Sequence, residues 1–170
     1  MNNDDKYLDR QYINIVRDIL DNEEFEKMSS IVHHGLDRKS HSIRVSYYSY
    51  KIARLIGLDY VGVARAGLLH DFFFENNQNS NICKRLQTLI KHPDYALVNA
   101  GKYFDLTNLE KDIIRSHMFP ISINLPLYAE GWLVNLVDDL VAISEVLYRT
   151  RTRLTYSLNF VLILMFTYLR

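Results

Sequence analysis

The chain has 170 residues and no formal net charge, since 20 Lys and Arg balance 20 Asp and Glu. It therefore lacks the overall basic field that attracts polyanions, and no nucleic-acid polymer is expected as a partner. Hydrophobic residues make up 48% and charged residues 24%, which excludes a disordered or collagen-like chain. This length and composition predict one globular domain over residues 1–170.

Apolar residues recur at helical spacing in the first half of the chain. Residues 1–30 are predicted to form N-terminal helices that pack on the rest of the domain. The next helix is expected to use Ser40 as its N-cap and to stop at Gly57, a residue suited to a C-cap. Asp59 then caps a helix that is apolar on most sides and ends in His70-Asp71.

The second half of the chain continues the helical pattern. The polar run 76–81 predicts a loop, and Pro93 suits the first turn of a further helix. Residues 107–110 match a capping box at the start of another helix, and a long helix follows from about Tyr128. Because no glycine-rich phosphate loop, internal repeat or convincing strand pair is present, the predicted fold class is all-α.

The C-terminal segment 149–170 is predicted to be an apolar helix. Its apolar run, Leu154 to Leu169, follows three arginines and has 16 residues, fewer than the roughly 20 that a spanning helix needs. A buried or dimer-forming helix is therefore the favoured interpretation, and membrane contact is the alternative. A homo-oligomer fits the first interpretation.

Cysteine content and the N-terminus indicate a compartment. A single cysteine, Cys83, cannot form an internal disulfide and suits a reducing environment. Residues 1–5 are acidic and polar, and no apolar run follows them as in a signal peptide. The sequence therefore predicts a cytoplasmic protein.

Carboxylates and imidazoles occur where the helices are otherwise apolar. His70-Asp71 ends the most apolar helix, and Asp138, after Asn135-Leu136-Val137, lies in an apolar face of a later helix. Burying such groups without strong partners is costly. A divalent cation removes this cost by binding neutral imidazole nitrogen and ionised carboxylate, so these residues indicate a metal site.

These residues occur in an order that a known family shares. His41 in Ser40-His41-Ser42-Ile43-Arg44-Val45, the pair ending Ala64–Asp71, and Val137-Asp138 resemble the H…HD…D pattern of the HD-domain metal-dependent phosphohydrolases. The resemblance covers about residues 33–145 and implies a single compact HD-type helical bundle. It also implies that His41, His70, Asp71 and Asp138 bind a first metal ion. Asp139 fits less well, because members of the family place the ligand directly after three apolar residues.

Some members of that family carry two further histidines before the last aspartate. His92 and His117 stand at these places, which implies a second ion bridged to the first by Asp71. The divalent ions that such a site could bind are Mn, Fe, Ni, Co, Zn and Mg. The alternative is that His92 is exposed at a helix start and that His117 is a hydrogen-bonded core histidine.

The resemblance implies hydrolysis of a small phosphorylated molecule, with a nucleotide as the first candidate, through hydroxide generated at the metal site. His70 and Asp71 then serve catalysis directly. Glu75 is a candidate general acid or base, with a solvent-facing loop position as the alternative. The glycine and lysine that follow the pair in cyclic-dinucleotide phosphodiesterases are missing, so that branch is disfavoured. A non-catalytic module that binds metal or nucleotide is the second hypothesis.

Phosphate recognition also needs hydrogen-bond donors near the metal site. Arg44 lies one turn after His41 on the expected helix, and Arg38 and Lys91 are further candidates. His34 is expected at the mouth of the pocket as a contact to ligand or substrate. For each cation the alternative is an exposed surface position.

Overall fold

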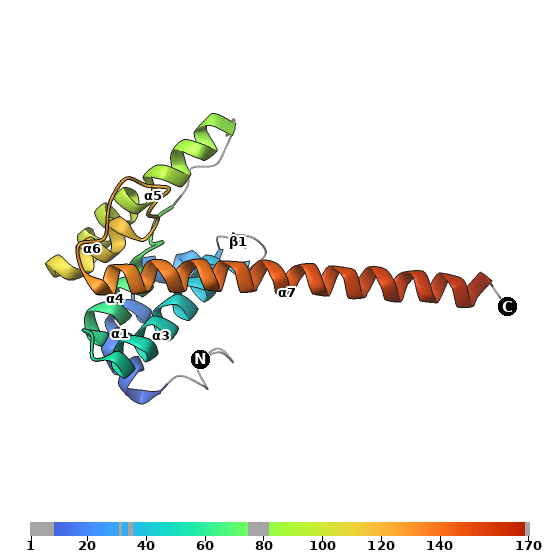
Figure 1. The fold of residues 1–170 in the computed structure, drawn as a ribbon, viewed down its shortest axis with the longest axis horizontal. Coiled ribbons are helices and arrows are strands. Elements are labelled where there is room, and N and C mark those ends of the chain that lie inside the picture. Colours follow the sequence, from blue (N-terminus) through green and yellow to red (C-terminus); the bar gives the residue numbers. More distant parts are fainter. Residues whose placement is uncertain (1–8, 31, 34–35, 75–81, 169–170) are drawn as a thin grey trace.

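The structure is a computed structural model that describes residues 9–30, 32–33, 36–74 and 82–168 (Figure 1). Helices form nearly all of its regular structure, which confirms the predicted all-α class. The elements in chain order are α1 Arg10–Leu20, α2 Glu23–Glu26, the 3-10 helix η2 Lys27–Ser30, β1 Val32–His33, β2 Leu36–Asp37, α3 Arg38–Ile56, α4 Tyr60–Leu69, α5 Ile82–Tyr103, α6 Asn108–Ser116 and α7 Ala129–Tyr168.

Helix α4 lies at the centre of the body, because its residues are too apolar for a surface position. It packs against α1, α3, α6 and α7. Most of its residues are fully buried, and Leu68 and Leu69 belong to the same core as Val45 of α3, Ile113 of α6 and Val134 of α7. The end of α4, and the His70-Asp71 pair that follows, therefore lies among four other helices.

Helices α3 and α4 approach each other closely where they cross. A Cβ atom added at Gly67 would lie 3.0 Å from the Cα of Ser46, which is tighter than ordinary van der Waals contact. The Ser46 hydroxyl donates to the carbonyl of Ala64 at 2.6 Å and accepts from the hydroxyl of Tyr12 at 2.8 Å. Glycine at position 67 thus fixes the short distance between the helices that carry His41 and His70.

Several predicted helix boundaries are confirmed. Gly57 ends α3 with a φ of 79°, and the Asp59 side chain accepts from the backbone N–H groups at the start of α4. The capping box of Thr107 and Glu110 opens α6 with both reciprocal hydrogen bonds. These signals are local, because each cap is formed by side chains within three residues of the backbone group that it satisfies.

Two local predictions are wrong. The N-cap of α3 is Asp37, whose carboxylate accepts from the backbone N–H of Ser40 at 2.8 Å, so the helix begins before Ser40. The carboxylate of Asp37 is a stronger acceptor than the hydroxyl of Ser40, three residues later. A short antiparallel pair, β1 with β2, precedes this cap. Its strands have two residues each, too few for a period-2 pattern to show in the sequence.

The position of Pro93 also differs from the prediction. Helix α5 begins at Ile82, so Pro93 lies in its interior rather than in its first turn. Proline cannot donate to the carbonyl four residues earlier, that of Leu89. The side chain of His92 donates to this carbonyl instead, at 2.9 Å, which replaces the missing backbone hydrogen bond.

Helix α7 has 40 residues and runs beyond the body of the molecule, with its first part against α3 and α6 (Figure 1). The segment expected as a separate C-terminal helix from residue 149 is continuous with it. Within the described part of the chain, none of the helices combines the length and the apolar character needed to cross a membrane.

Candidate metal centre

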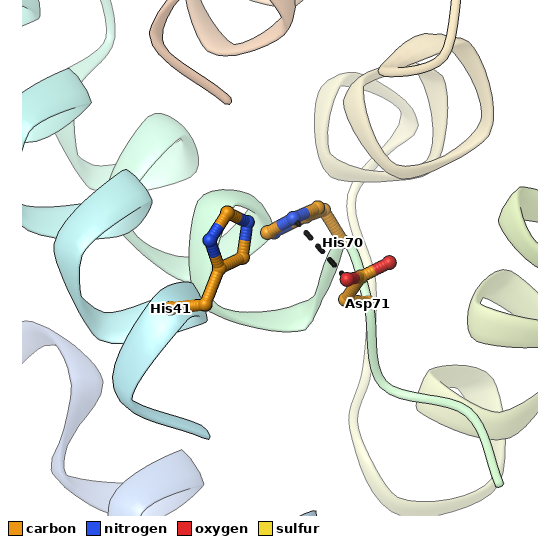
Figure 2. Close-up of side chains that lie close together, drawn as sticks. All are labelled: His41, His70 and Asp71. Atoms are coloured by element: carbon orange, nitrogen blue, oxygen red, sulfur yellow. Dashed lines mark ion pairs between the residues drawn. The ribbon is translucent and has the colours of Figure 1, made fainter. Parts of the chain in front are cut away.

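Six side chains from five parts of the chain converge at the end of α4. Three overlapping groups have potential ligand atoms within 4.8 Å of one another: His41, His70 and Asp71; His70, His117 and Asp138; and Asp71, His92 and His117. Together they contain all six residues that the sequence predicted as metal ligands. Figure 2 shows the rings of His41 and His70 side by side, with Asp71 beyond His70.

Three of the histidines are oriented by the same kind of local hydrogen bond. The Nδ1 atoms of His70, His92 and His117 lie 2.8–2.9 Å from the carbonyl oxygens of Gly67, Leu89 and Ile114, each three residues earlier. A carbonyl only accepts, so each Nδ1 carries a hydrogen and donates it. Whenever its ring is neutral, each of these histidines therefore presents an unprotonated Nε2 to the site, which is the tautomer that a metal ion requires.

These histidines stand where a helix leaves a carbonyl without its usual donor. His70 and His117 are the C-cap residues of α4 and α6, and the last carbonyls of a helix have no intrahelical partner. His92 precedes Pro93, which frees the carbonyl of Leu89 in mid-helix. The ends of α4 and α6 and Pro93 thus orient the three imidazoles toward one point.

The two nitrogens that face each other across the site are both acceptors. The Nε2 atoms of His92 and His117 lie 2.9 Å apart, so two lone pairs meet unless one ring takes a second proton. Burial disfavours that proton on His117, and the nearby His70 and His92 add to the effect, which lowers its pKa to about 4. At neutral pH a shared cation is the natural partner for these atoms.

The buried Nε2 of His70 also needs a cation as its partner. His70 is 1% exposed, and this nitrogen has no hydrogen-bond partner among the described residues. Its nearest acidic oxygens are Oδ1 of Asp138 at 3.6 Å and Oδ2 of Asp71 at 3.9 Å. Such an unsatisfied buried group is costly, and a cation between these atoms would satisfy all of them.

Asp71 faces both parts of the cluster with different oxygens. Its Oδ2 points toward His70, whereas Oδ1 lies 3.3 Å from Nε2 of His92 and 3.9 Å from Nε2 of His117. Burial alone would raise the pKa of Asp71, but the neighbouring imidazoles of His70, His92 and His117 lower it well below its ordinary value. An ionised carboxylate with this placement can bridge two cations.

His41 and Asp138 complete the side of the cluster nearest α7. Nε2 of His41 lies 2.9 Å from Oδ1 of Asp138. Burial disfavours a charge on His41, but hydrogen bonds to Asp138 and Glu145 outweigh it and raise its pKa to about 10. Asp138 is also buried, yet the charge of His70 and the bond from His41 hold its pKa well below its usual range.

One residue that sequence reasoning missed is Glu145, two turns after Asp138 on α7. Its buried carboxylate lies 3.2 Å from Nδ1 of His41 and accepts from Arg44 at 3.3 Å. A carboxylate on the Nδ1 side holds the ring with Nε2 toward the site. The sequence carried a signal for Glu145, because this carboxylate lies on the same face of the expected helix as Asp138.

The backbone around the ligands is fixed by side chains from other helices. Asn99 of α5 donates to the carbonyl of Phe72 at 3.1 Å, and Arg38 of α3 donates to that of Phe73 at 2.7 Å. The Phe73 ring stacks on His92 at 5.1 Å and receives the Arg38 guanidinium on its face at 4.0 Å. Asn135 of α7 donates to the carbonyl of His117.

The residues predicted to contact phosphate are placed differently from one another. Arg44 is 41% exposed beside Glu145, close to the metal-binding cluster, and Lys91 is exposed next to His92. Arg38 is buried, and its described contacts are with Phe73. His34 and Glu75 lie outside the described residues. The alternative of a solvent-exposed His92 is wrong, since its side chain is buried in the cluster.

Comparisons of the chain with protein families, with curated proteins and with solved structures found no match.

Proposed function

We propose that this protein is a metal-dependent phosphohydrolase of the HD-domain type, which cleaves a small phosphorylated molecule with two divalent ions in the cluster. The observation that carries the proposal is the set of three inward Nε2 lone pairs around a carboxylate whose two oxygens face different histidines. A site that served only to fill the core would pair these groups with one another through hydrogens.

The donor set assigns each residue a place. His41, His70 and Asp138 would hold one ion, His92 and His117 the other, and Asp71 would contact both. Such ions lower the pKa of water and neutralise charge on phosphate oxygens. Mixed imidazole and carboxylate donors suit Mn, Fe, Co, Ni or Zn better than Mg, which prefers oxygen ligands.

Neighbouring residues orient the ligands and place a positive charge beside them. Glu145 holds His41, and the carbonyls of Gly67, Leu89 and Ile114 fix the other rings. Asp71 is 20% exposed, so the cluster opens to solvent on its side. Arg44 lies near this cluster with 41% of its side chain exposed, and its guanidinium can contact a phosphate oxygen of the substrate.

The proposal is tested by hydrolysis assays on the purified full chain with phosphomonoesters, nucleotides and phosphodiesters, each with Mn²⁺, Co²⁺, Ni²⁺ and Mg²⁺. We expect release of phosphate or cleavage of at least one class, abolished by chelator and by His70→Ala. Asp139→Asn is the matched control, since Asp139 is an exposed neighbour of Asp138 on α7. Bound metal without turnover on every class would instead support a regulatory binding module.

A further inference from the structure

Helix α7 has two opposite faces with different neighbours. One face contacts the body through Val134, Val137 and Val141 and carries Asp138 and Glu145 to the metal centre. The other face holds four large aliphatic side chains that are 56–64% exposed: Leu136, Leu140, Ile143 and Leu147. At 100° per residue their mean direction is nearly opposite to that of the body face.

The four exposed residues follow the spacing of a coiled-coil seam. They are separated by four, three and four positions, which is the alternation of the a and d positions of a heptad. The sequence continues the same repeat along α7 with Thr150, Leu154, Ser157, Val161, Leu164 and Tyr168. We refer to these ten positions, from 136 to 168, as the α7 seam. Eight of the ten are apolar, over more than four heptads.

None of the described residues covers the seam at positions 136, 140, 143 and 147, where the side chains are exposed. Helix α7 continues well beyond α3 and α6, its neighbours in the body (Figure 1). A helix without tertiary contacts is only marginally stable in water, and a long exposed apolar stripe marks an interaction surface. We propose that the α7 seam pairs with the α7 seam of a second copy of this chain, as an antiparallel two-stranded coiled coil.

A second copy fits because heptad seams are self-complementary. Each a or d side chain of one helix fills a hole between four residues of the other, so an identical helix provides matching holes. The exposed seam is also on the scale of a real interface. Burying one aliphatic side chain removes roughly 60–120 Å² of apolar surface. The four exposed side chains from 136 to 147 account for roughly 240–480 Å² of such surface, and the continuation of the repeat with its flanking residues would supply the rest of the roughly 800 Å² per partner of a specific interface.

The charges beside the seam decide the orientation. Only three charged residues occupy the flanking e and g positions of the repeat: Asp139 in the first half of α7, and Arg151 and Arg153 in the second. A parallel pair would place the arginines of both copies in the same stretch, away from Asp139. An antiparallel pair with residue 139 opposite residue 153 brings Asp139 of each copy to the arginines of the other, which is the favourable arrangement. In this register the two seams overlap from residue 136 to residue 156.

The mass of the full-length protein in solution tests this proposal, by light scattering after gel filtration at micromolar concentration. We expect a dimer for the wild type and a monomer for Leu140→Glu/Leu147→Glu. Tyr148→Glu is the matched control, because Tyr148 is 71% exposed on α7 but lies outside the seam. It should remain dimeric. Circular dichroism and the bound metal count establish that the double variant is folded, independently of any hydrolase activity.

Orientation is measured by spin labels at position 155, introduced as Thr155→Cys in a Cys83→Ser background, because Thr155 is exposed outside the seam and its replacement leaves Asp139 and both arginines in place. Antiparallel pairing of position 139 with 153 separates the two labels by roughly 27 Å along the helices, whereas a parallel pair holds them at the same level. A short distance would overturn the antiparallel arrangement. A monomeric wild type, including one that sediments with lipid vesicles, or a double variant that stays dimeric would overturn the pairing itself.

Discussion

The metal centre and the α7 seam are opposite departures from the usual distribution of side chains. At the centre, histidines and carboxylates are buried at the end of the most apolar helix. On the seam, leucines and isoleucine are exposed on a helix that leaves the body. Each arrangement is costly for the isolated chain, by desolvation in the first case and by apolar hydration in the second. We propose a partner for each region: cations for the centre, and a second copy for the seam.

The two regions share α7 but use different faces, so they can be separated by mutation. The largest effect is expected from Asp71→Asn, which removes the carboxylate placed to face both ions. We expect loss of metal binding and a fall in hydrolysis by at least about 100-fold. The dimer should persist, as measured by light scattering. Dissociation of this variant would show that the two regions depend on each other.

The converse variant is Leu140→Glu/Leu147→Glu, which should abolish the dimer while the metal count per chain stays at the wild-type value. Neither residue lies on the face that carries Asp138 and Glu145. Elemental analysis of the gel-filtered monomer provides the count. A metal content that falls together with the dimer would mean that the seam supports the site.

A smaller effect is expected at Glu145, which contacts His41 but none of the other five clustered residues. Glu145→Ala should weaken metal binding by about 10-fold to 100-fold, the usual cost of removing a carboxylate behind a histidine ligand. Glu145→Gln keeps an acceptor for Nδ1 of His41 and should recover most of the affinity. Titration with Mn²⁺ or Zn²⁺ measures both. Equal losses in the two variants would contradict an orienting hydrogen bond.

The pH dependence of stability should have opposite signs with and without metal. The folded pKa of His41 is raised to about 10 from 6.5, so its contribution is complete below pH 6.5 and is lost as the pH rises through about 10. His70, whose pKa is also raised, acts in the same direction. Chelated protein should therefore lose unfolding free energy over this range.

A metal ion must displace the proton of His41, so metal binding and the stability it confers should increase over the same pH range. Urea denaturation at several pH values, with chelator and with saturating metal, compares the two curves. Parallel curves would argue against a metal ion at His41.

The smallest effect is expected from Arg44→Gln, on the exposed edge of the cluster. Loss of a partly solvated phosphate contact should raise KM a few-fold and leave kcat nearly unchanged, because such a contact binds ground and transition states alike. Steady-state kinetics with the best substrate measure the split. A comparable change from Lys51→Gln, at an exposed cation elsewhere on α3, would indicate a general charge effect.

Local signals in the sequence predicted much of this structure. The caps at Gly57, Asp59 and Thr107 depend on neighbours within a few residues, and all three are as predicted. Of the residues that converge, His70, Asp71 and Asp138 were predictable from their apolar surroundings, because a buried carboxylate or imidazole needs a strong partner. Glu145 meets that criterion equally. His41, His92 and His117 were predicted through the family resemblance.

The contacts that could not be predicted from the sequence depend on how distant parts of the chain pack together. Pro93 predicted a helix start, whereas the His92 side chain satisfies the carbonyl that Pro93 leaves free and the helix continues. The role of Arg38 depends on Phe73, which folds back between it and His92. Neither relation is visible in spacing or composition, because both join residues that meet only in the folded chain.

The count of tightly bound metal ions per chain tests the central claim most directly. Protein purified without chelator and measured by elemental analysis should hold two divalent ions, and His92→Ala should hold one. The His92 ring contacts Asp71 and His117 but has no described contact with His41 or Asp138, so one ion should remain. Fewer than one ion in the wild type, or a count that His92→Ala leaves unchanged, would contradict a two-metal centre.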